Sequence, residues 1–236
     1  MGCTIVVGGQ YGSEGKGKVV ALYAAGFREP WVVRCGGPNS GHTVDIRGRK
    51  LALRQVPAGA VHDNALLLLS AGCVIDEQLL LQEVEELDLV RDRIVVDPRA
   101  VLVTPSDRTL EQDAVQRIAS TASGTGAALI RRMARRGDAA LAADSEVLRG
   151  RVRVEPIAPL IHERLEEGGE VIVEGTQGFG LSLLHGPHYP FVTSRDTTAS
   201  GFAMEAGLSP RHIDSIILVN SYLSHPSWRQ QRTSQG

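Results

Sequence analysis

The chain has 236 residues, 42% of them hydrophobic, and this length and composition suit one globular core. Its formal net charge of −2 argues against a general nucleic-acid binder, which needs clustered Lys and Arg to neutralise phosphates. No apolar run approaches the roughly 20 residues of a membrane helix, and Cys3, Cys35 and Cys73 lack the paired spacing of zinc or disulfide frameworks. We therefore predict a cytoplasmic protein with no membrane or nucleic-acid partner.

The first third of the chain alternates between strand and helix patterns. Cys3 to Gly8 predicts a strand, and a glycine-rich turn leads from it into a helix over Lys16 to Ala25. Trp31 to Cys35 predicts the next strand, and Thr43 to Leu53 predicts a β-hairpin. Ala65 to Ser70 predicts a further buried strand.

The next segment, Asp76 to Leu89, has the spacing of an amphipathic helix. Asp76 is a suitable N-cap, and leucine and valine recur every three or four residues. The residues expected to face water are Glu83, Glu85 and Glu86.

After a strand at Arg93 to Val96, two further helices are predicted, at Thr109 to Ile118 and at Ala127 to Arg136. The small-residue loop Ser120 to Gly126 separates them. Apolar residues at helical spacing predict another helix over Ile157 to Leu165.

Gly168 and Gly169 end that helix before a strand at Val171 to Val173. This alternation predicts an α/β fold with a mainly parallel sheet, helices on both faces and the hairpin as a small flap. We predict one nucleotide-binding, catalytic α/β domain over residues 1–221. The segment 222–236 loses periodicity and is predicted to be an irregular tail.

The first chemical motif is the glycine loop, Gly8 to Lys18, which follows the first predicted strand. Glycines let successive backbone N–H groups approach an anion, and Lys16 can reach a terminal phosphate. The loop departs from the usual nucleotide P-loop, because Gly17 and not a hydroxyl residue follows the lysine. The alternative is a glycine turn that only joins strand to helix.

The second motif, Gly36 to Thr43, follows the second predicted strand and contains His42. In a parallel sheet, loops at the carboxyl ends of neighbouring strands meet, so this loop is expected beside the glycine loop. His42 could then donate a proton or a hydrogen bond to a developing oxyanion. The alternative is a structural loop histidine.

Together, these two motifs resemble the signature of the adenylosuccinate synthetase family. The resemblance runs from about Thr4 to about Asn220. Further matching segments are Ser120 to Gly126 with Ala134 to Gly137, then Glu174 to Gly178, and then Tyr189 to Ser194.

The resemblance implies a P-loop-NTPase-like fold and a purine-nucleotide ligase. In the family, GTP phosphorylates the 6-oxygen of a purine monophosphate, and the amino group of L-aspartate then displaces phosphate, with Mg²⁺ bridging the phosphates. It also implies a homodimer, in which Arg135 of one subunit reaches the purine monophosphate of the other. Without the family, Arg131, Arg132, Arg135 and Arg136 read as a solvated basic helix face.

The site residues implied by the resemblance fall into groups. Those expected to be catalytic are Ser13, Lys16 and His42, and those expected to bind Mg²⁺ are Ser13 and Gly41. Those expected to bind the nucleoside triphosphate are Gly12, Glu14, Gly15, Lys16, Gly17, Lys18, Gly41, His42 and Thr43. Those expected to bind the purine monophosphate are Asn39, Thr121, Arg135, Gln177 and Thr193. A metal role for the pair His185 and His188 is disfavoured, because no other ligand has suitable spacing.

Ser13 departs from the family, which has a catalytic aspartate there. A serine hydroxyl is a poor base near neutral pH, although it can hydrogen-bond or bind Mg²⁺. Serine at this place resembles the divergent phage-type branch, which joins aspartate to a guanine deoxynucleotide. The substrate is therefore IMP or (d)GMP, and the triphosphate is GTP or ATP.

The second departure is at the C-terminal end. Family members continue past Asn220 into an aspartate-binding arginine stretch and a guanine-recognising Lys-x-Asp element, and Ser224 to Arg229 does not continue that pattern. A compact variant, a truncated product and a degraded gene are alternatives. Two further functional readings stand beside the ligase: a nucleotide-binding module without ligase chemistry, and an inactive fragment.

Overall fold

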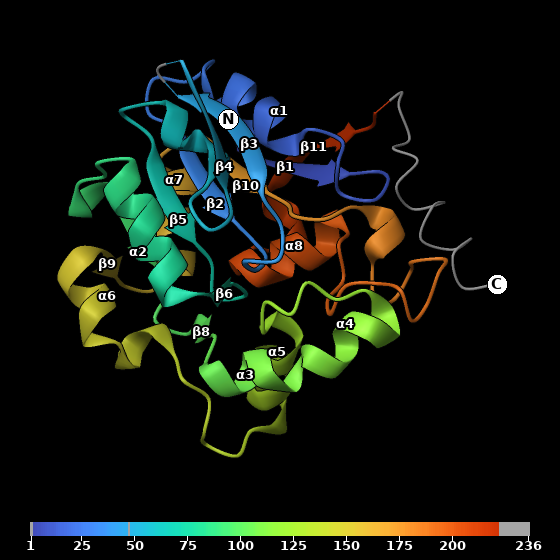
Figure 1. Cartoon of the computed structure of the whole chain (residues 1–236). Coiled ribbons are helices and arrows are strands. Elements are labelled where there is room, and N and C mark those ends of the chain that lie inside the picture. The colour runs from blue at the N-terminus through green and yellow to red at the C-terminus, as the bar shows by residue number, and fades with distance from the viewer. Residues whose placement is uncertain (1, 47, 222–236) are drawn as a thin grey trace.

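A seven-stranded sheet forms the centre of the computed structural model, which describes residues 2–46 and 48–221 (Figure 1). The strand order is β11-β1-β10-β2-β5-β7-β9, and every neighbouring pair is parallel. The strands are β1 (Cys3–Gly8), β2 (Trp31–Arg34), β5 (Leu66–Leu69), β7 (Ile94–Val96), β9 (Arg153–Val154), β10 (Val171–Glu174) and β11 (Ile213–Val219).

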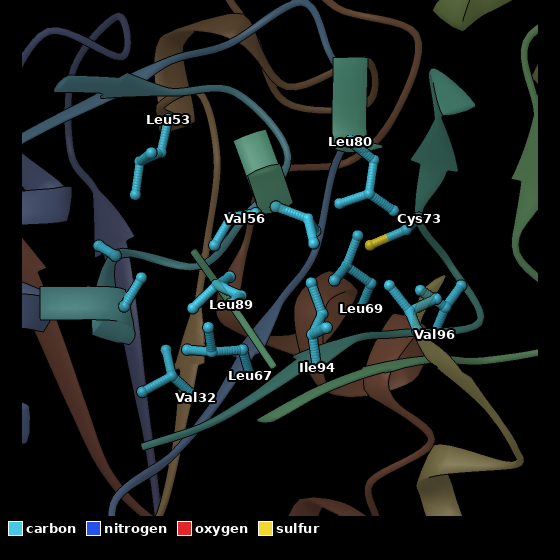
Figure 2. Packing of buried hydrophobic residues seen from close by; sticks show 14 of the residues in the cluster. Val32, Leu53, Val56, Leu67, Leu69, Cys73, Leu80, Leu89, Ile94 and Val96 are labelled. Carbon is cyan, nitrogen blue, oxygen red and sulfur yellow. The ribbon is translucent and has the colours of Figure 1, made fainter. Parts of the chain in front are cut away.

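Helices cover both faces of this sheet. On one face, side chains such as Val32 and Leu67 pack against α1 (Lys16–Ala24), α2 (Glu77–Glu86) and α6 (Glu146–Arg151). Figure 2 shows the core of this face, where Val32, Leu67, Leu69, Ile94 and Val96 gather beneath Leu80. The alternate residues face the other way and pack against α7 (Ile157–Glu166) and α8 (Ala199–Ala206). The predicted α/β fold with a mainly parallel sheet is confirmed.

Smaller units surround the sheet. The strands β3 (His42–Ile46) and β4 (Arg49–Leu53) form the predicted antiparallel hairpin. A two-stranded parallel ladder, β6 (Val74–Ile75) with β8 (Val101–Leu102), packs against α5 through its own small apolar cluster. The side layer consists of α3 (Pro105–Leu110), α4 (Gln112–Ile118) and α5 (Thr125–Ala134), and the short 3-10 turns are η1 (Ala58–Val61), η2 (Arg91–Arg93), η3 (Ala142–Asp144), η4 (Phe179–Leu181) and η5 (Pro210–His212).

Most predicted elements lie within one to three residues of the observed ones, and Asp76 caps α2 by accepting from the Leu79 N–H. The single helix predicted over Thr109 to Ile118 is wrong, because the structure has α3 and α4 there. Thr104 forms a capping box that starts α3 earlier, at Pro105. The sequence analysis does not predict six elements, namely β6, β8, β9, α6, α8 and β11.

The prediction that Glu83 faces water is also wrong. Its side chain is buried, and its carboxylate accepts hydrogen bonds from the backbone N–H groups of Arg54, Gln55 and Val56. The segment leaving β4 lies across this side of α2, so a position that would face water on an isolated helix is covered.

Across the described ranges, none of the helices is both long and apolar enough to span a bilayer. The predicted tail, residues 222–236 with Ser224 to Arg229 inside it, lies outside the described residues, so the domain boundary at residue 221 stays a prediction.

Candidate active site

Three loops meet at the carboxyl ends of the neighbouring strands β1, β10 and β2. They are the glycine loop after β1, the segment from Gly175 after β10, and the loop from Cys35 to His42 after β2. A Cβ atom placed on Gly17 would lie 2.5 Å from the Cβ of His42, and one on Gly12 would lie 3.3 Å from the Cα of Gln177. The predicted juxtaposition of the glycine loop and the His42 loop is therefore confirmed.

The ammonium group of Lys16 is buried inside the glycine loop. Lys16 Nζ donates to Glu14 Oε2 at 2.8 Å and to the Gly12 carbonyl at 3.3 Å. Glu14 Oε1 in turn accepts from the N–H groups of Gln10 and Gly12, both at 2.9 Å. Burial lowers the pKa of Lys16, although Glu14 opposes this shift. The glycine loop thus contains its own anion, Glu14, which is ion-paired with Lys16.

The N-terminus of α1 is open. Its N-cap, Gly15, has a left-handed φ of 92°, and a Cβ placed there would meet nothing within 4 Å. Among residues 2–46 and 48–221, no acceptor bonds the N–H groups of Gly15, Lys16 or Gly17. By contrast, side chains such as Asp76 cap other helices. Unpaired N–H groups at a helix start, beside a lysine, suit a phosphate group.

A buried charge network lies directly behind His42. Glu174, at the end of β10, bonds His42 Nδ1 through Oε1 and also accepts from Arg34 Nη1 at 2.7 Å. Its other oxygen, Oε2, accepts from the Ala58 N–H at 2.7 Å. The two strands that carry this ion pair are in register, with Glu174 opposite Arg34.

This network fixes the proton on His42. Burial by itself would raise the pKa of Glu174, but His42 and Arg34 outweigh it and hold that pKa below its usual value. The ionised carboxylate can only accept, so His42 Nδ1 must carry the proton. Burial also lowers the pKa of His42 against the opposing effect of Glu174. His42 Nε2 is then left buried with no partner in the described part of the chain, on the loop that touches Gly17.

A second region lies where the loop from Cys35 to His42 approaches α5. A Cβ on Gly37 would lie 2.8 Å from Thr125 Cγ2 and 3.4 Å from Asn39 Oδ1. The hydroxyl groups of Thr121, Ser123 and Thr125 form a hydrogen-bonded row here. This places Asn39 and the Thr121 loop in one neighbourhood.

The α5 N-terminus itself is occupied by a buried carboxylate. Glu111 accepts from the N–H groups of Gly124 at 2.7 Å and Ala127 at 3.1 Å, and also from that of Gly126. Gly126 also lies beside Ser194, which follows Thr193, and the Thr193 hydroxyl is buried without a partner in the described ranges. The amides of Gly124, Gly126 and Ala127 at the start of α5 are therefore already paired within the chain.

The remaining predicted residues divide by position. Ser13, Lys18, Gly41 and Thr43 are exposed at the rim of the two converging loops. Arg135 is not brought to the site: it is exposed just past the C-terminal end of α5, about 15 Å of helix from Thr125.

Sequence reasoning missed Arg34, Glu174 and Glu111 as site residues. A signal existed for the first two, because each ends an otherwise apolar four-residue strand with a charge, and the two charges are opposite. Glu111 gave no comparable signal, since it lies among other polar residues between two helices.

Within the described ranges, no group of at least three His, Cys, Asp or Glu side chains is arranged to hold a metal ion. His185 stacks on Phe179 and His188 on Tyr11, with ring centroids 6.1 Å apart in both pairs. The exposed Ser13 hydroxyl and Gly41 carbonyl are hard oxygen donors. They fit Mg²⁺, which takes few protein ligands and completes its shell with phosphates and water.

Comparisons with known proteins agree with this arrangement. A profile of the adenylosuccinate synthetase family matches residues 5–153 and 139–225. The chain belongs to the adenylosuccinate synthetase family. The adenylosuccinate synthetase of Archaeoglobus fulgidus is 40% identical over 93% of this chain, and that of Thermococcus sibiricus is 40% identical over 91% of it. The chain spans 64% of the length of each of these relatives.

Two solved structures share the fold. The cyanophage S-2L succinoaminodeoxyadenylate synthetase, bound to dGMP and to dATP as an energy donor, is 29% identical, with a TM-score of 0.81 over 93% of this chain and 64% of its own. The fully ligated adenylosuccinate synthetase of Plasmodium falciparum has a TM-score of 0.82 over 92% of this chain and 61% of its own, at 22% identity.

Proposed function

We propose that the protein is a purine-nucleotide ligase that joins L-aspartate to C6 of a purine monophosphate through a 6-phosphoryl intermediate. The observation that carries this proposal is the contact between Gly17 and His42, which places an open helix start, a buried lysine and a buried imidazole side by side. Family membership supports the same chemistry.

The triphosphate would lie along the glycine loop, at the open amides of Gly15 to Gly17. Lys16 would reach the terminal phosphate of the triphosphate. That phosphate would either share the Lys16 ammonium group with Glu14 or take the place of Glu14 beside it. The exposed residues Lys18 and Thr43 would meet the outer part of the nucleotide. We assign Glu14 to the nucleotide site through this pairing and not through direct contact with phosphate.

His42 would act on the transferring phosphoryl group and the 6-oxygen. Its Nδ1 proton is held by Glu174, so only Nε2 is left to gain or lose a proton at the site. A bound triphosphate adds negative charge near the ring, which favours the protonated form and makes Nε2 a donor. Mg²⁺, held by Ser13, Gly41 and the phosphates, would neutralise charge on the triphosphate.

The purine monophosphate would lie between the second region and Gln177. Asn39, Thr121 and Thr193 would bind it, and its phosphate would meet hydroxyl groups or compete with Glu111 for the α5 amides. Arg135 would come from a second copy in a homodimer. The exposed Ile130 and Met133 on α5 offer an apolar face beside it for that contact.

The finer assignment is the phage-type branch. Ser13 supports it, and so does the fold shared with the cyanophage enzyme, whose structure holds dGMP and dATP. On this reading (d)GMP and ATP are the preferred pair, with IMP and GTP as the alternative pair. Free, buried Cys3, Cys35 and Cys73 suit the reducing cytoplasm in which we place the protein.

The test is phosphate release with L-aspartate and Mg²⁺ in the four combinations of ATP or GTP with IMP or dGMP, with the succino-purine identified by mass. One combination should give product that requires all the components. Absence of turnover in every combination rejects the ligase.

A nucleotide-binding module without ligase chemistry is the second candidate, and the exposed Ser13 hydroxyl favours it because serine is a poor base. It predicts saturable binding by isothermal titration with no product formed. An inactive fragment would show neither, and no nucleotide would raise its melting temperature.

A further inference from the structure

Glu83 on α2 is a buried carboxylate that sequence reasoning placed in water. Oε1 accepts from the Arg54 N–H at 2.6 Å, and Oε2 accepts from the N–H groups of Gln55 at 3.0 Å and Val56 at 2.8 Å. One carboxylate side chain thus pairs three successive amides just after β4. Hydrogen bonds to a charged acceptor are stronger than neutral ones, so this segment is held firmly.

The segment held by Glu83 touches the His42 loop in two ways. The side chain of Arg54 donates from Nε to the Pro38 carbonyl at 2.7 Å. The Arg54 carbonyl accepts from Arg34 Nη2 at 3.1 Å, and the same Nη2 donates to the Ser40 carbonyl at 3.2 Å. Two carbonyl groups of the loop before His42 are therefore held: Arg54 binds that of Pro38, and Arg34 binds that of Ser40.

Arg34 completes the connection, because its Nη1 donates to Glu174, the carboxylate that holds His42 Nδ1. Glu83 therefore reaches the imidazole through Arg54 and Arg34 without touching it. A shift of the 54–56 backbone would move a carbonyl that Arg34 binds, and a misplacement of about 1 Å at a reacting group can cost about 100-fold in rate.

We propose that Glu83 is a positioning residue for His42, acting from α2 through the backbone of residues 54–56. The inference rests on the proposed function only in assigning a reaction to His42. Its structural content is that removing the carboxylate disturbs the His42–Glu174 hydrogen bond.

The test uses Glu83→Gln with Glu86→Gln as its matched control. Glu86 lies on the same helix, but it is half exposed, and its carboxylate pairs with the exposed Arg49. Gln at position 83 keeps the side-chain size but presents an amide N–H₂ to backbone donors. We expect kcat to fall about tenfold or more, with the KM for the triphosphate within twofold of wild type. Glu86→Gln should leave both unchanged.

A second variant guards against loss of folding. Arg54→Met removes the Nε contact with Pro38, while the backbone N–H that Glu83 binds remains. The Arg54 side chain is exposed, so we expect this variant to keep its melting temperature and to lose kcat in the same direction as Glu83→Gln.

A readout independent of activity is the low-field ¹H resonance of the His42 Nδ1–H, assigned with ¹⁵N-histidine and by its absence in His42→Gln. This resonance should shift or broaden in Glu83→Gln and Arg54→Met and stay unchanged in Glu86→Gln. If wild type makes no succino-purine, the proposed function fails and the resonance alone decides. Folded Glu83→Gln or Arg54→Met with unchanged resonance and unchanged kcat would overturn the inference, as would a kcat loss fully explained by the unfolded fraction.

Discussion

The helices α1 and α5 begin alike and yet offer different sites. Each follows a loop rich in small residues, and each has a left-handed glycine as its N-cap, Gly15 with φ 92° and Gly124 with φ 79°. The first amides of α1 have no acceptor among the described residues, whereas Glu111 closes those of α5. A glycine-rich helix start is therefore an anion site only where the rest of the fold leaves it open.

The two internal carboxylates also differ in what they bind. Glu14 pairs with the amides of Gln10 and Gly12, which precede the α1 N-cap, and with Lys16. Glu111 pairs with the N-cap amide of α5 and amides of its first turn. The glycine loop can thus accept a phosphate without losing its internal contacts to the backbone, but the α5 start cannot.

The largest expected effect comes from removing the α1 lysine. Lys16→Ala should weaken triphosphate binding by about 100-fold, roughly 3 kcal/mol, because a charge-assisted hydrogen bond is lost. It also leaves Glu14 without its cation, so the melting temperature should fall. Isothermal titration measures the affinity, and Lys50→Ala, on the exposed hairpin, is the control. Equal triphosphate affinities of Lys16→Ala and Lys50→Ala would show that the anion site does not lie at the start of α1.

Opening the α5 start should make it resemble that of α1. Glu111→Ala leaves amides unpaired and should destabilise the fold by about 2–3 kcal/mol. Millimolar inorganic phosphate should then raise the melting temperature of the variant more than that of wild type, since an anion can replace the carboxylate. An equal phosphate effect on both proteins would contradict the comparison.

The contact between the loops can be tested with one methyl group. Gly17→Ala places a Cβ 2.5 Å from that of His42 and should cost about 2 kcal/mol of stability and lower turnover. Gly150→Ala, in α6 with nothing within 4 Å of the new atom, is the control and should be neutral or slightly stabilising. Chemical denaturation compares them. A Gly17→Ala protein as stable and as active as wild type would contradict the close contact between the two loops.

The smallest effect is a pH dependence on the α5 side. Asp107 anchors α5 through Arg131, and although burial would raise the pKa of Asp107, the bonds from Arg131 and Thr104 hold it below its usual value. The ionised Asp107 therefore stabilises the folded state fully above its pKa in the unfolded chain, about 4. This stabilisation is lost as pH falls through the lower pKa of Asp107 in the folded protein.

Asp107→Asn should accordingly cost about 1–2 kcal/mol at pH 7 and progressively less below pH ~4. Denaturation midpoints across this range measure the difference. A gap between variant and wild type that stays constant or widens as pH falls would rule out the ion pair as its source.

Much of the fold could be predicted because its strands are buried on both faces and read as short apolar runs, as in Val171–Glu174. The strand β11 ends in a similar apolar run, Ile216 to Val219, but it lies at a sheet edge with Ile216 and Leu218 exposed, and the sequence analysis does not predict it. The two-residue strands β6 and β8 are too short for any periodicity.

The meeting of the Gly17 and His42 loops was predictable, because each motif directly follows a strand of a parallel sheet. The supporting charges of the site were not, because they depend on which strands become neighbours. Arg34 meets Glu174 only since β10 enters the sheet between β1 and β2. Glu83 is predicted to be a solvated charge until the segment that covers it is placed, and the backbone amides that Glu111 binds become apparent only once α5 is placed beside it.

The strand order of the sheet also determines when its strands can pair during synthesis. The strand β1 precedes both of its neighbours in the sequence: it pairs with β10 and β11, so Cys3 lies beside Val171 and Thr4 beside Ser215. Translation must pass β10, which ends at Glu174, before β1 meets its first neighbour, and it must pass β11 before β1 meets its second, so the edges of β1 stay unpaired meanwhile. Such distant partners slow folding and favour aggregation, so yield in a recombinant host should improve at low temperature or with added chaperones.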